Sequence, residues 1–204
     1  MSPVAVCYAT REGQTRIVAE RVATLLRDRG LAADVFDISK IHSAFSLEPY
    51  VGAILAASVH LGRHDREMIS FVTKHRAELG KLPTAFLSIS LSEAEAEREA
   101  APADERAKAS DRVTKMLEQF YADTGWHPTR TKPVAGTLAY SRYNFLVRFV
   151  MKRIARAAGM PTDTTHDYEY TDWAALDGFA RAFADELTGA SHPRFASASA
   201  NVVS

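Results

Sequence analysis

The stretch that decides the fold lies near the N-terminus and reads Val4-Ala5-Val6-Cys7-Tyr8-Ala9-Thr10-Arg11-Glu12-Gly13-Gln14-Thr15-Arg16-Ile17-Val18. Its first six residues form an almost continuous apolar run, which is typical of a strand buried on both faces of a parallel sheet. From Gln14 to Arg29 the apolar side chains recur at the spacing of an amphipathic helix, and Gly30 is a suitable end for that helix. The stretch therefore predicts a β-strand, a tight turn and an α-helix.

The same alternation of apolar runs and amphipathic segments continues along the chain. Further strands are expected at 33–38, 51–57, 82–89 and 132–138, and further helices at 65–79, 105–121 and from about 171 onward. Strands that alternate with helices form βαβ units, so the sequence predicts an α/β fold in which helices cover both faces of a five-stranded parallel sheet. Ligands bind such sheets beyond the carboxyl ends of the strands. We therefore expect function in the loops Thr10–Thr15, Ser58–His64 and Ser90–Glu93.

The composition of the 204 residues limits the kind of protein this can be. Lys plus Arg and Asp plus Glu are 25 each, so the formal net charge is zero, and a nucleic-acid binder that relies on overall basicity is not expected. The chain has no run of about 18 apolar residues, and its first residues lack the basic stretch of a secretory signal. Cys7 is the single cysteine, which excludes an internal disulfide. We expect a cytoplasmic protein.

The turn Thr10–Thr15 has the residue types of a phosphate-binding loop. Backbone N–H groups at a helix start converge on an anion, and the helix dipole favours its charge. Thr10 and Thr15 add hydroxyl groups, and Gly13 lets the backbone curl closely. Neither G-x-G-x-x-G nor G-x-x-x-x-G-K-S/T occurs, so the monophosphate of a small cofactor fits better than a dinucleotide or a triphosphate. An ordinary strand–helix turn capped by threonine explains the loop about equally well.

Four stretches together resemble the flavodoxin-type protoporphyrinogen dehydrogenases of bacteria. They are Thr10–Thr15, Ala57–Gly62, Tyr140–Tyr143 and Tyr170–Trp173. The resemblance extends over residues 3–188, and its T-x-x-G-x-T pattern is shared with flavodoxin-like proteins in general. It implies a flavodoxin-like three-layer fold over residues 1–188, with strand order 2-1-3-4-5 and an insertion at 140–161 that carries a basic helix.

The resemblance also implies a cofactor and a reaction. The family oxidises protoporphyrinogen IX to protoporphyrin IX in haem biosynthesis and passes the electrons to a membrane quinone, with FMN carrying the chemistry. The resemblance implies that the FMN phosphate lies at the loop Thr10–Thr15. It also implies that the isoalloxazine ring lies between the loops near Ser58–Gly62 and Ser88–Leu91. The second loop offers histidine and leucine where such sites usually place an aromatic ring. The cofactor-binding residues expected on this basis are Thr10, Arg11, Glu12, Gly13, Gln14, Thr15, Ser58, His60, Leu61, Gly62, Ser88, Ile89, Ser90 and Leu91.

The segment between Tyr140 and Met160 contains basic residues and no acidic residue. Apolar residues at 145, 146, 149, 150 and 154 share one helical face, flanked by basic residues every four positions. Such a helix can lie on an anionic membrane surface, which predicts peripheral association with the inner membrane. A helix packed on the domain is the alternative, and guanidinium groups could instead hold the substrate propionates. The candidate substrate or membrane residues are Arg142, Tyr143, Arg148, Lys152, Arg153 and Arg156.

Two other functions stay open at this point, an electron-transfer flavodoxin and a membrane-associated binding module without flavin. Electron-transfer flavodoxins are usually strongly acidic, and the zero net charge of this chain favours the enzyme. Leu61, in place of an aromatic residue, motivates the flavin-free alternative.

His60 and His64 with one close carboxylate are too few for a metal site, which needs three or four ligands. We expect a solvated loop and helix face at 93–112 and a disordered tail at 189–204.

Overall fold

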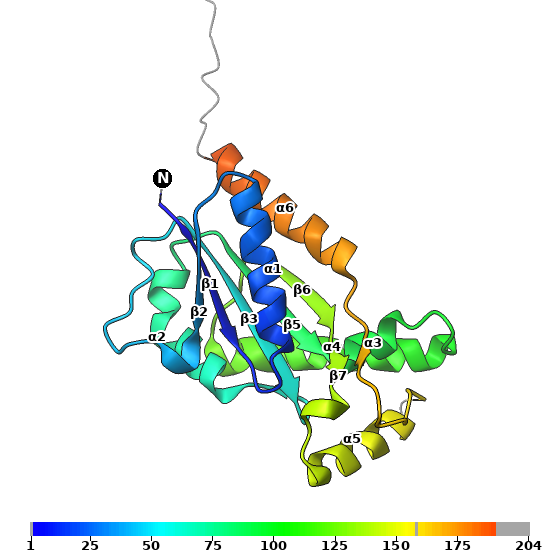
Figure 1. Cartoon of the computed structure of the whole chain (residues 1–204). Coiled ribbons are helices and arrows are strands. Elements are labelled where there is room, and N and C mark those ends of the chain that lie inside the picture. The colour runs from blue at the N-terminus through cyan, green and yellow to red at the C-terminus, as the bar shows by residue number, and fades with distance from the viewer. Residues whose placement is uncertain (1, 158, 191–204) are drawn as a thin grey trace, which may run out of the picture.

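The chain folds into three layers, with a mainly parallel sheet between helices (Figure 1). The structure is a computed structural model and describes residues 2–157 and 159–190. The long strands are β1 (Val4–Ala9), β2 (Ala33–Asp37), β3 (Gly52–His60), β5 (Thr84–Ser90) and β6 (Arg130–Ala135). They lie in the order β2-β1-β3-β5-β6, and each neighbouring pair is parallel. The predicted five parallel strands and their order are confirmed.

The end of β3 differs from the prediction, because the expected loop at 58–64 is a hairpin. β3 continues to His60, and β4 (Arg63–His64) returns antiparallel to it. Leu61 has a φ of 51° and Gly62 a φ of 76°. Two successive positive φ angles are those of a type I′ turn, whose twist matches that of a two-residue hairpin. The sheet therefore gains a short sixth strand beside the end of β3.

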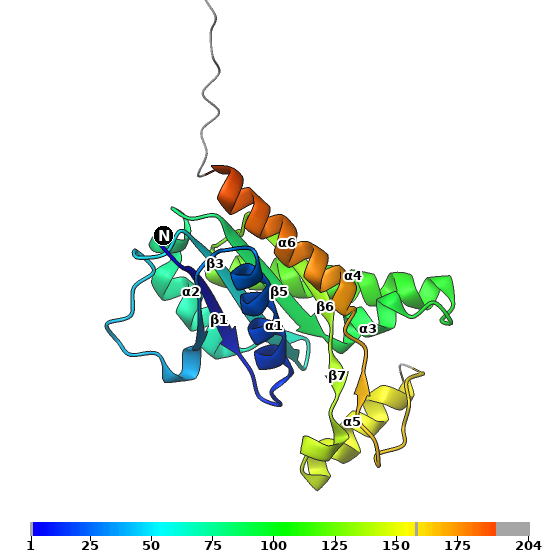
Figure 2. The same ribbon diagram turned by 45° about the horizontal axis from the view of Figure 1, so that its top comes forward.

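Two helices cover each face of the sheet (Figures 1 and 2). The helices are α1 (Gln14–Asp28) and α6 (Trp173–Ala190) on one face, and α2 (Arg66–Leu79) and α4 (Ala103–Thr124) on the other. Successive side chains of β1 point to opposite faces of the sheet, so the strand contributes to the apolar core on both faces. Val4 and Val6 pack with α1 and α6, whereas Ala5 and Cys7 pack with α2 and α4. Cys7 is fully buried, and burial raises the pKa of its thiol.

An additional helix, α3 (Leu91–Glu97), follows β5 directly. The Ser90 hydroxyl accepts a 3.1 Å hydrogen bond from the Glu93 N–H and so caps the helix start. Burial raises the pKa of Glu93 to about 6, and the neighbouring Glu97 carboxylate adds to the increase. The prediction of a solvated loop is wrong for this part of 93–112, because the acidic run is a capped and partly buried helix.

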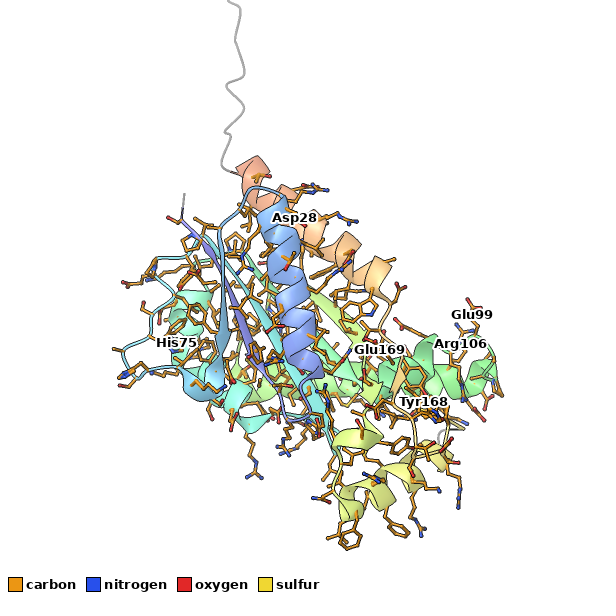
Figure 3. All side chains as sticks on the ribbon, viewed as in Figure 1. Asp28, His75, Glu99, Arg106, Tyr168 and Glu169 are labelled. Atoms are coloured by element: carbon orange, nitrogen blue, oxygen red, sulfur yellow. The ribbon has the colours of Figure 1, made fainter. Side chains whose placement is uncertain are left out.

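The insertion after β6 forms a small unit at the carboxyl edge of the sheet (Figures 1 and 2). Its elements are β7 (Thr137–Leu138), the 3₁₀ turn η2 (Tyr140–Arg142), α5 (Phe145–Ala157) and β8 (Tyr168–Glu169); a further 3₁₀ turn, η1 (Ile38–Lys40), follows β2. β7 and β8 pair antiparallel, so the fifth predicted strand is split in two at Gly136. Figure 3 labels Tyr168 and Glu169, where the chain returns from the insertion to the three-layer body.

The last helix begins as predicted and runs slightly further than expected. The Asp172 carboxylate accepts a 2.9 Å hydrogen bond from the Ala175 N–H, so Asp172 caps α6. α6 extends to Ala190, two residues into the predicted tail, whereas 191–204 lie outside the described residues, as does the side chain of Ile154. Within 2–157 and 159–190, no helix combines the length and the apolar character that crossing a membrane requires.

Candidate functional site

A cavity of about 770 Å³ opens at the carboxyl edge of the sheet. Residues of all three predicted loops line it, from Thr10–Thr15, Ser58–Gly62 and Ile89–Ser92. These segments follow or end β1, β3 and β5, whose carboxyl ends meet at that edge. The volume lies within the range of about 300–1,000 Å³ that is usual for small-molecule sites. The cavity is therefore the candidate site.

The first loop has unsatisfied donors at the point where α1 begins. Gly13 has a φ of 92°, and its N–H donates a 2.9 Å hydrogen bond to the Thr10 hydroxyl oxygen. The Thr15 side chain is 1% exposed, and its hydroxyl has no hydrogen-bond partner among the described residues. The first N–H groups of any α-helix also lack partners within the helix. A phosphate would satisfy both kinds of donor, so the loop fits a phosphorylated cofactor.

Arg142 of the insertion lies against this loop. Its Nη1 donates a hydrogen bond to the main-chain carbonyl of Glu12. A Cβ placed on Gly13 would displace the same nitrogen at the end of the flexible Arg142 side chain, and the positive φ is what favours glycine at this position. Tyr143 lines the cavity beside Arg142, and burial raises the pKa of its phenol to about 12. The Tyr143 hydroxyl therefore keeps its proton at neutral pH.

A buried carboxylate joins the first loop to the hairpin. Asp65 is 5% exposed and accepts hydrogen bonds of 2.8 Å from Arg11 Nε and 2.8 Å from Ser58 Oγ. His60 Nε2 lies 3.0 Å from Ser58 Oγ and 3.5 Å from Glu12 Oε2. These contacts hold the imidazole of His60 on the cavity wall and fix the two loops relative to each other.

Two residues that the sequence associates with this region, His64 and Ser88, do not line the cavity. His64 Nε2 is 2.8 Å from Ser88 Oγ, and its ring packs against Phe86 and Phe120. Burial lowers the pKa of His64 to about 4, so the ring is neutral at neutral pH. Ser88, an expected cofactor ligand, bonds to His64 and does not line the cavity. Within the part of the chain described, no group of His, Cys, Asp or Glu forms a metal-binding cluster.

The other expected cofactor residues of the second and third loops lie around the opening. Leu61, Gly62, Ile89, Ser90 and Leu91 all line the cavity. Leu61 is 92% exposed at the hairpin tip.

Gln14 ties the first loop to the end of the insertion. Its amide Nε2 donates hydrogen bonds of 3.1 Å to Glu169 Oε1 and 3.0 Å to Thr171 Oγ1 (Figure 3 labels Glu169). The Thr171 hydroxyl in turn donates to the Ala135 carbonyl at 2.9 Å. Arg142 and Gln14 thus connect the insertion to the loop from two sides.

Part of the cavity wall comes from residues outside the three predicted loops. They are Glu95 of α3, Arg112, Lys115 and Met116 of α4, Gly136 and Thr137, and Leu146, Val147, Val150 and Met151 of α5. The periodicity of α4 and α5 predicts an apolar face for each helix, but tertiary packing decides what that face contacts. The Thr137 hydroxyl, like that of Thr15, is buried without a partner in the described residues.

The helix α5 presents large apolar side chains to solvent. Phe145 is 78% exposed and Phe149 is 61% exposed. Arg153 and Arg156 are also exposed, whereas Arg148 is half-buried and its Nη2 donates a 3.2 Å hydrogen bond to the Tyr143 carbonyl. Arg148 is therefore less accessible to a membrane surface than the other basic residues at the end of the flank, Arg153 and Arg156. Of the candidate substrate or membrane residues, Arg142 and Tyr143 line the cavity, and Arg148, Lys152, Arg153 and Arg156 do not.

The chain is similar in sequence to a known family and to named proteins. The profile of the family described as "Flavodoxin domain" matches residues 5–165. The protein named "Protoporphyrinogen IX dehydrogenase (quinone)" of Escherichia coli (strain K12) is 32% identical over 179 residues, which cover 88% of this chain and 93% of that protein. A protein of the same name from Leishmania major is 33% identical over 178 residues, which cover 87% of this chain and 72% of that protein.

Solved structures show the same fold at low identity. A short-chain flavodoxin associated with a bacterial microcompartment aligns with a TM-score of 0.55 at 12% identity, over 94% of this chain and 100% of that chain. Rubredoxin oxygen:oxidoreductase of Desulfovibrio gigas aligns with a TM-score of 0.53 at 13% identity, over 95% of this chain and 38% of that chain. By its profile match and its relatives, the chain belongs to the Flavodoxin domain family and, within it, to the flavin-type oxidoreductases named protoporphyrinogen IX dehydrogenases (quinone).

Proposed function

We propose that this protein binds FMN in the cavity and oxidises protoporphyrinogen IX to protoporphyrin IX, with a membrane quinone as the electron acceptor. The observation that carries the proposal is the unpartnered, buried Thr15 hydroxyl at the start of α1, on the wall of a cavity formed by the three predicted loops. The names of the relatives support the substrate and the acceptor. FMN supplies the hydride transfer when it is bound, and the side chains of the cavity bind and orient it.

The FMN phosphate is assigned to the loop Thr10–Thr15. The Thr15 hydroxyl would donate to a phosphate oxygen, beside the free N–H groups of the helix start. A ligand there would remove the cost of leaving a buried hydroxyl unpaired, about 1–3 kcal/mol. Arg142, held over the same loop, adds positive charge near the phosphate. FMN carries one phosphate, which agrees with the absence of dinucleotide and triphosphate motifs.

The isoalloxazine ring is assigned to the space between the hairpin and the end of β5. His60 and Leu61 of the hairpin and Ile89 of β5 all line the cavity there. The imidazole of His60 is the planar group available for stacking, and Ser58 fixes its orientation through a 3.0 Å contact. Leu61 contributes apolar surface at the rim, where its exposure leaves it accessible to a second ligand.

The membrane surface is assigned to the outer face of α5. Phe145 and Phe149 are exposed apolar anchors of the kind that insert at the headgroup boundary. Lys152, Arg153 and Arg156 follow on the same helix, and each basic residue near an anionic surface contributes about 1 kcal/mol of attraction. The opposite face of α5 lines the cavity, so a protein docked in this way would hold its active site close to a lipid-dissolved quinone. On this basis we propose peripheral association with the cytoplasmic side of the inner membrane.

An anaerobic assay tests the proposed reaction. The purified protein is loaded with FMN and mixed with protoporphyrinogen IX and a quinone, and porphyrin fluorescence is followed against a protein-free blank. We expect porphyrin to form only when protein, FMN and quinone are all present. A protein that binds FMN but forms no porphyrin above the blank would be an electron carrier and would contradict the proposed activity. A protein that takes up no FMN would be the flavin-free binding module.

A further inference from the structure

The cavity extends well beyond the three loops assigned to the cofactor. One group of lining residues belongs to α4, with Arg112, Lys115 and Met116, and another to α5, with Leu146, Val147, Val150 and Met151. Both helices lie outside the predicted loops in sequence, and together with α3 they line a second, open part of the same cavity. If FMN occupies the three loops, this second part would adjoin it and could receive a substrate.

The second part of the cavity has an apolar wall. Leu146, Val147 and Val150 lie on one side of α5, and Met151 continues that side. Met116 contributes a flexible thioether from α4, of the kind that adapts to irregular apolar surfaces. Such a wall suits the broad apolar ring system of a porphyrinogen.

Two cations lie on α4 at the edge of the same space. Arg112 and Lys115 are three residues apart on the helix, so their side chains are neighbours on its surface. Arg112 Nη2 is already paired with Glu95 of α3. Lys115 has no ion-pair or hydrogen-bond partner among the described residues 2–157 and 159–190. The ammonium group of Lys115 is therefore available to a ligand.

We propose that Arg112 and Lys115 form a carboxylate-binding subsite that receives the two propionate groups of the substrate. The proposal rests on the proposed function and names a part of the substrate site within it. Lys115 supplies an unpaired point charge, and the planar guanidinium of Arg112 retains further N–H donors beside its contact with Glu95. The apolar wall from α5 orients the macrocycle, and the two cations set its direction relative to the flavin.

Lys108 provides a matched comparison on the same helix. It is exposed like Lys115, but its Nζ is paired with Asp104 Oδ2 at 3.1 Å, and it does not line the cavity. If Lys115 were an ordinary solvated lysine, replacing either residue would have the same small effect. A specific effect at Lys115 would mark the subsite.

The experiment compares a diacid with its neutral ester on the FMN-loaded protein. Binding of protoporphyrin IX and of its dimethyl ester is titrated by fluorescence, and kcat and KM are measured with the corresponding porphyrinogens. We expect Lys115→Ala to raise the Kd and the KM of the diacid about two- to fivefold with little change in kcat, and Lys115→Glu to raise them further. The Kd and the KM of the ester should be unchanged in both variants. Lys108→Ala should leave these constants unchanged for both the diacid and the ester.

Two results would overturn the subsite. One is an unchanged diacid affinity in Lys115→Glu, and the other is an equal loss for diacid and ester. Absence of porphyrin formation in the wild-type protein would contradict the proposed function instead. The fluorescence titration tests the subsite in either case, because it measures binding of the finished porphyrin and needs no turnover.

Discussion

Arg142 and Glu12 lie 130 residues apart in the chain, yet the Arg142 guanidinium donates a hydrogen bond to the main-chain carbonyl of Glu12. This contact attaches the insertion to the loop assigned to the phosphate. Gln14 makes a second attachment through Glu169 and Thr171. The position of α5 and the shape of the loop are therefore coupled, because each helps to hold the other.

Replacing Arg142 should loosen both ends of this contact. We expect Arg142→Met to raise the Kd for FMN about three- to tenfold, since the lost hydrogen bond contributes about 0.5–1.5 kcal/mol to the ordered loop. Hydrogen exchange should also become faster across residues 140–157. Arg153→Met, on the exposed side of α5, is the control and should leave FMN affinity unchanged. Equal behaviour of the two variants would show that the contact has no role in shaping the loop.

The carboxylate of Asp65 should contribute to stability. It is buried and accepts hydrogen bonds from Arg11 and Ser58. We expect Asp65→Asn to lower the free energy of unfolding by about 1–3 kcal/mol, because the neutral amide weakens the contact with the guanidinium and brings donors to an acceptor position. Urea denaturation of the FMN-free protein measures this value. Asp111→Asn, at an exposed position, should change it little, and a similar change in both variants would contradict the role of Asp65.

The buried His64 predicts a pH dependence of stability. Burial lowers the pKa of His64 from 6.5 to about 4 in the folded protein, so between these values the unfolded chain binds a proton that the folded chain does not. Stability therefore falls as the pH falls from 6.5 toward 4, with a contribution from His64 of up to about 3 kcal/mol. The raised pKa of Glu93 has the opposite effect on stability. As the pH rises toward about 6, the folded chain keeps a proton on Glu93 that the unfolded chain has released, so stability falls.

Comparing His64→Gln with the wild-type protein isolates this contribution. The amide can keep a hydrogen bond to Ser88 without titrating. We expect the difference in unfolding free energy between the two proteins to shrink steadily from pH 6.5 to pH 4. A constant difference over that range would mean that His64 titrates normally in the folded state.

The outer face of α5 should govern binding to lipid. We expect the triple variant Lys152→Glu, Arg153→Glu, Arg156→Glu to bind anionic vesicles about a hundredfold more weakly, given about 1 kcal/mol for each basic residue. Sedimentation with the vesicles measures the bound fraction. A triple reversal of Lys40, Lys74 and Lys81, which are exposed and lie outside α5, controls for the change in net charge. If both triple variants bind equally weakly, the attraction depends on net charge and α5 is not the docking surface.

Local periodicity predicted most of the fold. The alternation of apolar and polar residues placed five strands and their helices, and Thr10–Thr15 was correctly expected at the edge where the cavity opens. The β3–β4 hairpin was missed because Leu61 occupies a position of positive φ, where asparagine or glycine is the usual signal. The helix α3 was missed because its acidic composition is also typical of a solvated loop.

The remainder of the site depends on tertiary contacts. The charged residues of α4 cannot be told apart by their spacing in the sequence. Only the folded structure shows that two of them, Arg112 and Lys115, line the cavity. Likewise, the family resemblance implies that Ser88 is a cofactor ligand, yet its hydroxyl bonds to His64 and does not line the cavity. Sequence spacing defines the face of an element, and packing determines which partner that face meets.

The most direct test of the central claim compares FMN with riboflavin, which lacks the phosphate. Both are titrated by flavin fluorescence into the wild-type protein, Thr15→Ala and the control Thr24→Ala, whose exposed hydroxyl donates to the Glu20 carbonyl on the same helix. If the loop binds the phosphate, the wild-type protein and Thr24→Ala will strongly prefer FMN, and Thr15→Ala will lose about tenfold in affinity for FMN alone. Equal affinities of the wild-type protein for FMN and riboflavin would contradict the account.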